Sequence, residues 1–304
     1  MFYVLYLHFN FTTVIIFTEA GHKYTHFESG NNLKGWTSLI SKFTKPFNRE
    51  AQLTCSAYKL LLGDIIYNNA VQSEFRRLYD LDVEKVKDFL EYNFGEKDAI
   101  ETIRQDIAYE WDYVAINGTK CHRELEKASF ERGWEINPFT GEKYDTVHME
   151  KQYDNQSLAD NLFDIKDGYY PELLVWDNTM DQSQTVVTQI DKCFIQTIKK
   201  KRYVDIGDYK FNRKRPDTGK KYFMKAPLDM YNDNKAEKYK MQARFGAFLL
   251  STFGFIPRNC SFTHYLHSDL NKGKDYIADY DHEIMLEFQK EWIKITADNQ
   301  EVTS

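Results

Sequence analysis

The second half of the chain combines short β-type runs with stretches of helical periodicity. Runs rich in Val, Ile, Tyr and Phe between polar or Lys-rich turns predict five strands, at Glu172–Trp176, Thr185–Ile190, Lys192–Thr197, Tyr203–Phe211 and Cys260–Leu266. Apolar residues three and four positions apart predict a helix over Lys238–Phe253, which Gly254 and Pro257 would end. A final helix is expected over His282–Thr296. The sequence therefore predicts that the sheet lies after Pro171.

The first half is expected to be a hairpin followed by helices. Val14–Phe17 and the segment up to Tyr24 predict a hairpin whose turn holds Gly21, and Trp36–Phe43 predicts a short helix. From about Glu50 to Trp111, apolar residues at helical spacing among charges predict further helices. The sequence thus predicts a helical region before the sheet.

A separate helix is expected after Gly118, with Thr119 as its N-cap. In this helix His122, Leu125 and Glu126 would share one face.

No repeat or low-complexity block divides the chain, so one domain over residues 1–304 is expected. Within it we expect four parts: the hairpin and short helix over 1–49, a helical insertion over 50–115, a catalytic core over 116–266 and a C-terminal helical region over 267–304. A chain of 304 residues that is 42% hydrophobic can fill a sizeable core, which excludes wholesale disorder.

Charge is distributed unevenly along the chain. The formal net charge is -6, so the protein is not globally basic and any nucleic-acid surface must be local. Residues 192–225 hold twelve basic and three acidic residues, a net charge of +9, and would attract a polyanion. The candidate DNA-binding residues lie in this segment: Lys199, Lys200, Lys201, Arg202, Arg213, Lys214 and Arg215. The first four are equally consistent with a solvated hairpin turn.

The four cysteines lie far apart without a C-x-x-C pair, which is typical of a reduced, cytoplasmic protein. The most hydrophobic stretch, Phe2–Phe17, has no preceding Lys or Arg and contains polar residues. No membrane segment is therefore expected, with a signal peptide or anchor as the less favoured alternative. Whether residues 1–13 belong to the fold stays open.

Three carboxylates and one amine form the candidate catalytic cluster. Strand periodicity places Asp208 and Lys210 on the same face of one strand. Asp191 ends one predicted strand and Glu172 begins another. If these strands are neighbours, the carboxylates form a hard-oxygen site suited to Mg²⁺ or Mn²⁺, because a divalent cation relieves their mutual repulsion.

Five motifs in order resemble those of the PD-(D/E)xK nuclease superfamily, in its RecB/Cas4-like branch and particularly its phage-encoded exonucleases. The matching segments are Gly118–Glu126 for G-x-x-x-H-x-x-L-E, Pro171-Glu172, Thr188–Asp191 for G-x-(I/V)-D, Asp208–Lys210 for D-x-K, and Gln242 for Q-x-x-x-Y. Two positions depart from the pattern: Thr188 replaces the usual Gly, and Gly246 replaces the usual Tyr.

The resemblance implies a restriction-endonuclease-like α/β fold, with a central mixed sheet of four to five strands flanked by helices in the order αβββαβ. It implies one or two Mg²⁺ or Mn²⁺ ions, the first held by His122, Asp191, Asp208 and the Tyr209 carbonyl. A second, weaker ion near Glu172 would assist the leaving oxygen, Lys210 would orient or deprotonate the attacking water, and Gln242 would help to order the substrate. Cys260 stands alone, so no iron-sulfur cluster is expected.

The function that the resemblance implies is a Mg²⁺-dependent deoxyribonuclease, foremost an exonuclease in DNA recombination, repair or degradation. The alternatives are an endonuclease of restriction or junction-resolving type and a catalytically silent DNA-binding module.

At the level of residues, Asp208 and Lys210 could form an exposed salt bridge, His122 could be a partly buried histidine, and Gln242 could be a polar position on the rim of its helix. DNA is the expected partner, in the host cytoplasm if the protein is phage-encoded. A recombinase or helicase partner, the oligomeric state and the polarity of digestion are left open by the sequence.

Overall fold

The computed structural model covers all 304 residues and describes 15–18, 23–26, 28–45, 47–75, 82–95, 97–147, 156–158, 162–181, 185–212, 214–216, 223–266 and 269–297. Its contacts divide the chain into two compact units. Residues 1–44 and 122–304 form one, called here the sheet unit, and residues 45–121 form the other, called the helical unit. Among the described helices, none is long and apolar enough to cross a membrane.

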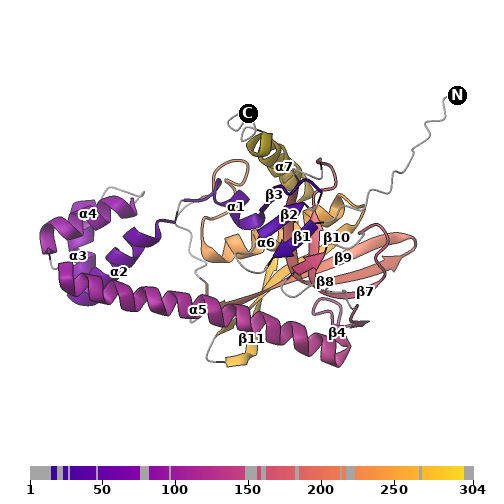
Figure 1. The fold of residues 1–304 in the computed structure, drawn as a ribbon, viewed down its shortest axis with the longest axis horizontal. Coiled ribbons are helices and arrows are strands. Elements are labelled where there is room, and N and C mark those ends of the chain that lie inside the picture. Colours follow the sequence, from indigo (N-terminus) through magenta and orange to yellow (C-terminus); the bar gives the residue numbers. More distant parts are fainter. Residues whose placement is uncertain are drawn as a thin grey trace. The chain divides into compact units, whose positions relative to one another are not determined.

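The helical unit consists of four helices that pack around a small apolar core (Figure 1). They are α2 (Arg49–Leu62), α3 (Asp64–Phe75), α4 (Val83–Phe94) and the first part of α5 (Lys97–Arg132). Asn48 caps α2 by accepting a hydrogen bond from the Ala51 amide at 3.0 Å, and Asp82 caps α4. The expectation of helices from about residue 50 to 111 agrees with these elements.

The sheet unit is α/β, as expected, with a mixed sheet flanked by helices. Its elements are β1 (Ile15–Thr18), β2 (Lys23–His26), β3 (Asn32–Gly35), α1 (Trp36–Ile40), β4 (Trp134–Ile136), β5 (Lys143–Asp145), β6 (Gln156–Leu158), β7 (Gly168–Trp176), β8 (Val186–Ile198), β9 (Lys201–Asn212), α6 (Lys235–Ser251), β10 (Ile256–Leu266), β11 (Asp269–Ala278) and α7 (His282–Ala297).

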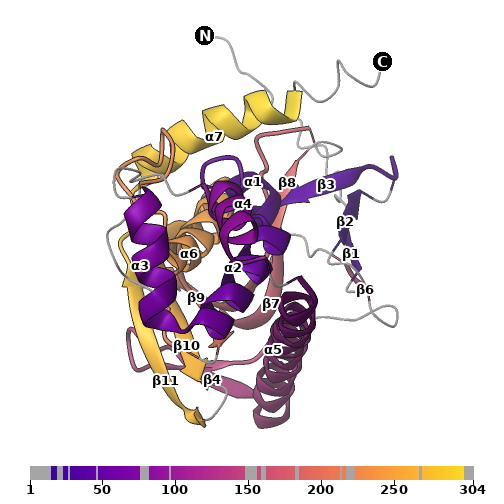
Figure 2. The same cartoon turned by 90° about the vertical axis from the view of Figure 1, so that its left-hand side faces the viewer.

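An antiparallel meander of β7, β8 and β9 lies at the centre of the sheet, and β10 runs parallel to β9 after the crossover helix α6. Figures 1 and 2 show α6 against these strands. The described strands of the main sheet number nine, and not four to five. The hairpin β1–β2 joins the sheet through β3, and β11 forms an edge strand. The sequence of β11 is rich in Asn, Lys and Asp, so it carries no strand pattern. The turn expected at Gly21 lies outside the described residues.

The two strands predicted on either side of Asp191 are one strand, β8. The sequence predicts a strand end at Asp191 because an acidic residue in an apolar run is typical of a turn. Its side chain instead accepts a hydrogen bond from the Tyr209 amide of β9, which allows a buried carboxylate inside the sheet.

The helix start expected at Thr119 is also wrong. Gly118 and Thr119 lie inside α5, which runs unbroken for 36 residues, and the Thr119 hydroxyl donates to the Ala115 carbonyl. A glycine inside a helix costs about 1 kcal/mol, and the 36-residue helix tolerates this cost. The boundary between the two units therefore falls inside a helix, between Cys121 and His122.

Helices α1, α6 and α7 share one aromatic core above the sheet. The rings of Phe245 on α6, Phe288 and Trp292 on α7 and Trp36 on α1 contact one another in tilted or edge-on arrangements. Gly246 on α6 brings the helix close to the sheet, since a Cβ there would lie 2.9 Å from Ile190 Cγ1. This close approach accounts for glycine at the position where the resemblance expects tyrosine.

The β8–β9 hairpin closes with the two-residue turn Lys199-Lys200, whose φ angles are 48° and 66°. Both values are those of a left-handed conformation, which costs a non-glycine residue about 1–2 kcal/mol. Replacing the pair by Asn-Gly, the pair that such turns prefer, is expected to stabilise the protein by about 1 kcal/mol. Urea denaturation checks this, and a lower stability of the variant would contradict the strain assigned to the turn.

Candidate metal centre

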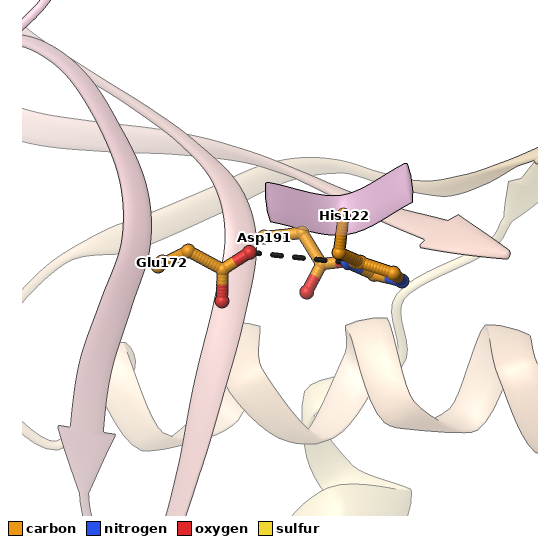
Figure 3. Close-up of side chains that lie close together, drawn as sticks. All are labelled: His122, Glu172 and Asp191. Atoms are coloured by element: carbon orange, nitrogen blue, oxygen red, sulfur yellow. Dashed lines mark ion pairs between the residues drawn. The ribbon is translucent and has the colours of Figure 1, made fainter. Parts of the chain in front are cut away.

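Three side chains from three elements converge in the sheet unit: His122 from the last part of α5, Glu172 from β7 and Asp191 from β8 (Figure 3). One ligand atom of each lies within 4.8 Å of the others. His122 Nδ1 is 3.4 Å from Asp191 Oδ2 and 3.9 Å from Glu172 Oε1. Glu172 and Asp191, which follow His122 by 50 and 69 positions, are thus brought to it at one point.

Asp191 occupies the place where β8 and β9 stop pairing. The pairs between these strands run from Ile198–Lys201 at the turn to Lys192–Gly207, and they stop one residue short of Asp191. In place of the next backbone bond, Asp191 Oδ2 accepts from the Tyr209 amide at 2.5 Å. The divergence of the strands leaves room for a side chain, and the hydrogen bond fixes the direction of the carboxylate.

Glu172 adopts a left-handed backbone conformation, with φ of 55°. The register from β7 to β8 pairs Pro171 with Lys192 and Leu173 with Ile190 but skips Glu172 itself. The Glu172 carbonyl instead accepts from Gln189 Nε2 at 3.3 Å. A strained residue inside a regular strand is a feature of functional sites, where the strain directs a side chain.

Asp208 and Lys210 form an ion pair on the face of β9 that α6 covers, and the Lys210 ammonium lies 5.2 Å from the ring of Tyr239 on α6. Tyr209 and Phe211, which alternate with these two residues along β9, project from the opposite face, where their rings contact the ring of His122. Among the described residues, Asp208 is not part of the close group of metal-ligating atoms. The ligand group thus contains Glu172, while the predicted ligand Asp208 is paired with Lys210. Tyr209, whose carbonyl was the predicted ligand, contacts this group through its amide, which donates to Asp191, and through its ring, which lies against His122.

The cluster perturbs the proton affinities of its members. Burial alone would lower the pKa of His122, but the carboxylates of Asp191 and Glu172 outweigh it and raise the pKa to about 9. Burial raises the pKa of Asp208 to about 7, against the effect of Lys210. Burial and the neighbouring Glu172 raise the pKa of Asp191, although His122 opposes them. Burial lowers and the Asp208 and Asp191 carboxylates raise the pKa of Lys210, with a net increase.

Burial is the largest cause of the raised pKa values of Asp191 and Asp208, and the carboxylates of Asp191 and Glu172 in turn raise the pKa of His122, so the centre favours a positive charge. Two carboxylates lie within reach of one imidazole, and the imidazole becomes a better base for that reason. A divalent cation would supply the same charge, and carboxylate oxygens with one imidazole nitrogen are ligands that Mn²⁺ and Mg²⁺ accept. The residues present therefore fit a divalent metal, for which His122, Glu172 and Asp191 would provide three ligands.

The raised pKa values predict how the stability of the metal-free protein depends on pH. For His122, the stabilisation is full below about pH 6.5 and is lost as the pH rises through 9, since the folded pKa lies above the unfolded one. The raised pKa of Asp208 likewise makes the folded protein less stable as the pH rises from about 4 to 7. In EDTA, the free energy of unfolding should fall by up to about 3 kcal/mol more in wild type than in His122→Gln between pH 6.5 and 9. Urea titrations at both pH values check this, and equal slopes in the two proteins would contradict it.

The predicted DNA-binding residues do not gather at this centre. Lys199 and Lys200 lie at the hairpin tip, where Lys201 pairs with Ile198. The tip is seven residues along β8 from Asp191, or about 23 Å. Arg202 donates to three backbone carbonyls, of Leu162, Phe163 and Ile165, and lies over the ring of Phe255.

The remaining predicted residues lie on other elements. Arg215 donates to the His264 carbonyl at 2.8 Å, and Lys214 is exposed. Arg213 lies outside the described residues. Gln242 is half-buried on α6 and takes no part in the described contacts among the acidic residues.

Two neighbours of the centre were not predicted from the sequence. Burial, followed by Glu172 and Asp191, raises the pKa of Tyr24 on β2 above its usual range. Lys192 is buried on β8 next to Asp191. A lysine between two apolar strand segments is the sequence signal that could have identified it, since a buried lysine requires partners.

Comparisons with known proteins add little to this geometry. No protein-family model matches the sequence, and a search of curated proteins finds no significant match. A solved structure titled "Crystal structure of SSO0001" is similar over 86% of this chain and 76% of that chain, with 12% sequence identity and a TM-score of 0.30. That TM-score is too low for any conclusion about fold or function.

Proposed function

We propose that the protein is a Mg²⁺- or Mn²⁺-dependent deoxyribonuclease of the PD-(D/E)xK type, acting foremost as an exonuclease. The observation that carries the proposal is the convergence of His122, Glu172 and Asp191 within 4.8 Å, with the Asp208–Lys210 pair on the adjoining strand. Once the short strands β4, β5 and β6 are set aside, the order α5, β7, β8, β9, α6, β10 supports a restriction-endonuclease-like core, because it matches the αβββαβ order that the sequence resemblance implies.

A bound divalent cation would polarise the scissile phosphate and offset its developing charge. His122, Glu172 and Asp191 bind and orient in this scheme. Asp191 is held in place by the Tyr209 amide, and Glu172 by its strained backbone.

Lys210 acts as a donor in this arrangement and not as a base. Its pKa is raised, because the Asp208 and Asp191 carboxylates outweigh the effect of burial, so it carries its proton at neutral pH. A protonated amine beside the phosphate would stabilise the transition state and orient the attacking water. Asp208 holds the ammonium in place through their ion pair.

The charge of residues 192–225 supports DNA as the substrate, since phosphate contacts provide most of the affinity for nucleic acid. The lysines at the hairpin tip would then contact DNA about 23 Å from the scissile phosphate, or roughly seven base-pair steps away. Arg202 has its donors directed at carbonyls, so we assign it a structural role.

End-labelled linear duplex incubated with the protein and Mg²⁺, with EDTA as control, tests the activity, its metal requirement and its polarity together. Covalently closed DNA in parallel separates an exonuclease, which needs an end, from an endonuclease. Cleavage of linear DNA that EDTA abolishes is expected. Binding of DNA without cleavage in either metal would contradict the proposal and favour a catalytically silent module.

A further inference from the structure

Lys192 on β8 is buried at the residue next to Asp191. It is 7% exposed, and burial lowers the pKa of its ammonium, against the effect of Asp275 and Asp191. Burying an ammonium costs several kcal/mol unless it has partners. A buried ammonium at this position therefore requires specific partners, and these partners indicate its role.

The Lys192 ammonium connects four neighbouring strands. It donates to the Thr263 hydroxyl on β10 at 2.9 Å and lies 4.4 Å from the centre of the Tyr209 ring on β9. The Thr263 hydroxyl in turn donates to Asp275 Oδ1 on β11 at 2.7 Å. One side chain of β8 thus contacts β9 and β10 directly and is linked to β11 through Thr263.

Gly207 on β9 provides the space for this side chain. A Cβ at Gly207 would lie 2.6 Å from Lys192 Cε. Lys192 and Gly207 are also the last register pair before β8 and β9 diverge. The contact is therefore located at the point where the strands separate to admit the Asp191 carboxylate.

We infer that Lys192 is a positioning residue for the metal centre: by holding Tyr209 and the β9–β10 pair at the divergence, it fixes the Tyr209 amide that orients Asp191. This inference rests on the proposed metal site. Lys192 faces Tyr209, on the opposite side of the strand from its neighbour Asp191, so it acts through Tyr209 and binds no metal itself.

The sign of the effect on metal affinity separates positioning from simple electrostatics. Removing a positive charge near a cation site would tighten cation binding by reducing repulsion. Removing a residue that orients a ligand weakens cation binding, typically by 10-fold to 100-fold. Lys192→Met keeps the length of the side chain and removes both the charge and the hydrogen bond.

The experiment is a calorimetric titration of Mn²⁺ into the purified full-length protein, with thermal unfolding of each metal-free variant. We expect Lys192→Met to bind Mn²⁺ about 10-fold more weakly than wild type. Its thermal stability should be lower than that of wild type, because the Thr263 hydroxyl and the Tyr209 ring lose their buried partner. An affinity equal to or tighter than that of wild type would overturn the inference.

Thr263→Val provides a second test if Lys192→Met folds poorly. It removes the acceptor of Lys192 and should weaken Mn²⁺ binding in the same direction, and the two substitutions together should cost less than the sum of their separate effects. Gln289→Leu is the matched control, since it removes a buried amide that donates to Asp177 at 2.7 Å outside this cluster. If it weakens Mn²⁺ binding equally, Lys192 has only a general structural role. A wild-type protein that binds no Mn²⁺ would instead overturn the proposed metal centre, and the inference with it.

Discussion

Replacing Lys210 by Met is expected to lower the rate of DNA cleavage by roughly 10³-fold, the usual effect of removing a donor that acts in the transition state. Lys210 carries its proton between Asp208 and the Tyr239 ring, so the substitution removes a fixed positive charge from the proposed site of the scissile phosphate. DNA binding should change little, because many phosphate contacts share the affinity. Single-turnover cleavage and a binding assay in Ca²⁺ measure the two effects separately.

Lys235→Met is the matched control for this experiment. Lys235 is exposed, and its ammonium lies 5.8 Å from the centre of the same Tyr239 ring and 2.7 Å from Asn212 Oδ1, outside the acidic group. It should cleave DNA at nearly the wild-type rate. If Lys210→Met keeps full activity, Lys210 and Asp208 are a structural salt bridge, which was the alternative that the sequence left open.

Replacing Glu172 by Gly should change stability and activity in opposite directions. The left-handed backbone at Glu172 costs about 1–2 kcal/mol, and glycine removes that cost at the expense of about 0.4–1 kcal/mol of unfolded-state entropy. Loss of the carboxylate relieves its repulsion with Asp191 but also removes its attraction for His122, so the two electrostatic changes offset each other. The metal-free variant should therefore be more stable than wild type by about 1 kcal/mol, while cleavage falls by roughly 10²-fold or more.

Glu172→Gln separates the backbone effect from the loss of charge. It removes the charge but keeps a side chain in the strained conformation, so the difference in stability between the Gly and Gln variants measures the backbone strain less the unfolded-state entropy cost of glycine. Chemical denaturation in EDTA gives both values. A Gly variant less stable than the Gln variant would show that the conformation of Glu172 is not strained and that its direction needs another explanation.

The chemistry-bearing residues were more predictable than the strand topology that joins them. His122, Glu172, Asp191, Asp208 and Lys210 were all proposed from local patterns, and the structure gathers them in one region of the sheet unit. Local patterns allowed a pairing of Asp208 with Lys210 but could not decide between that pairing and metal binding, nor show that Glu172 joins the ligand group, because that choice depends on where β8 and β9 diverge.

The failures have a common physical reason: tertiary contacts outweighed local preference. Gly118 and Asp191 both indicate breaks when taken alone, yet a long helix tolerates the first and a backbone amide binds the second. The role of Arg202 could not be predicted either, since its partners are carbonyls of a loop about forty residues away. Charge patterns identify where cations are abundant but not which of them are already bound.

The most direct test of the metal centre is anomalous diffraction from crystals of the protein soaked in Mn²⁺. The account predicts an anomalous peak within about 2.3 Å of His122 Nδ1, a Glu172 carboxylate oxygen and Asp191 Oδ2, and its loss in Asp191→Asn. A well-ordered crystal with no peak between these three side chains, or with the ion bound elsewhere in the sheet unit, would contradict it.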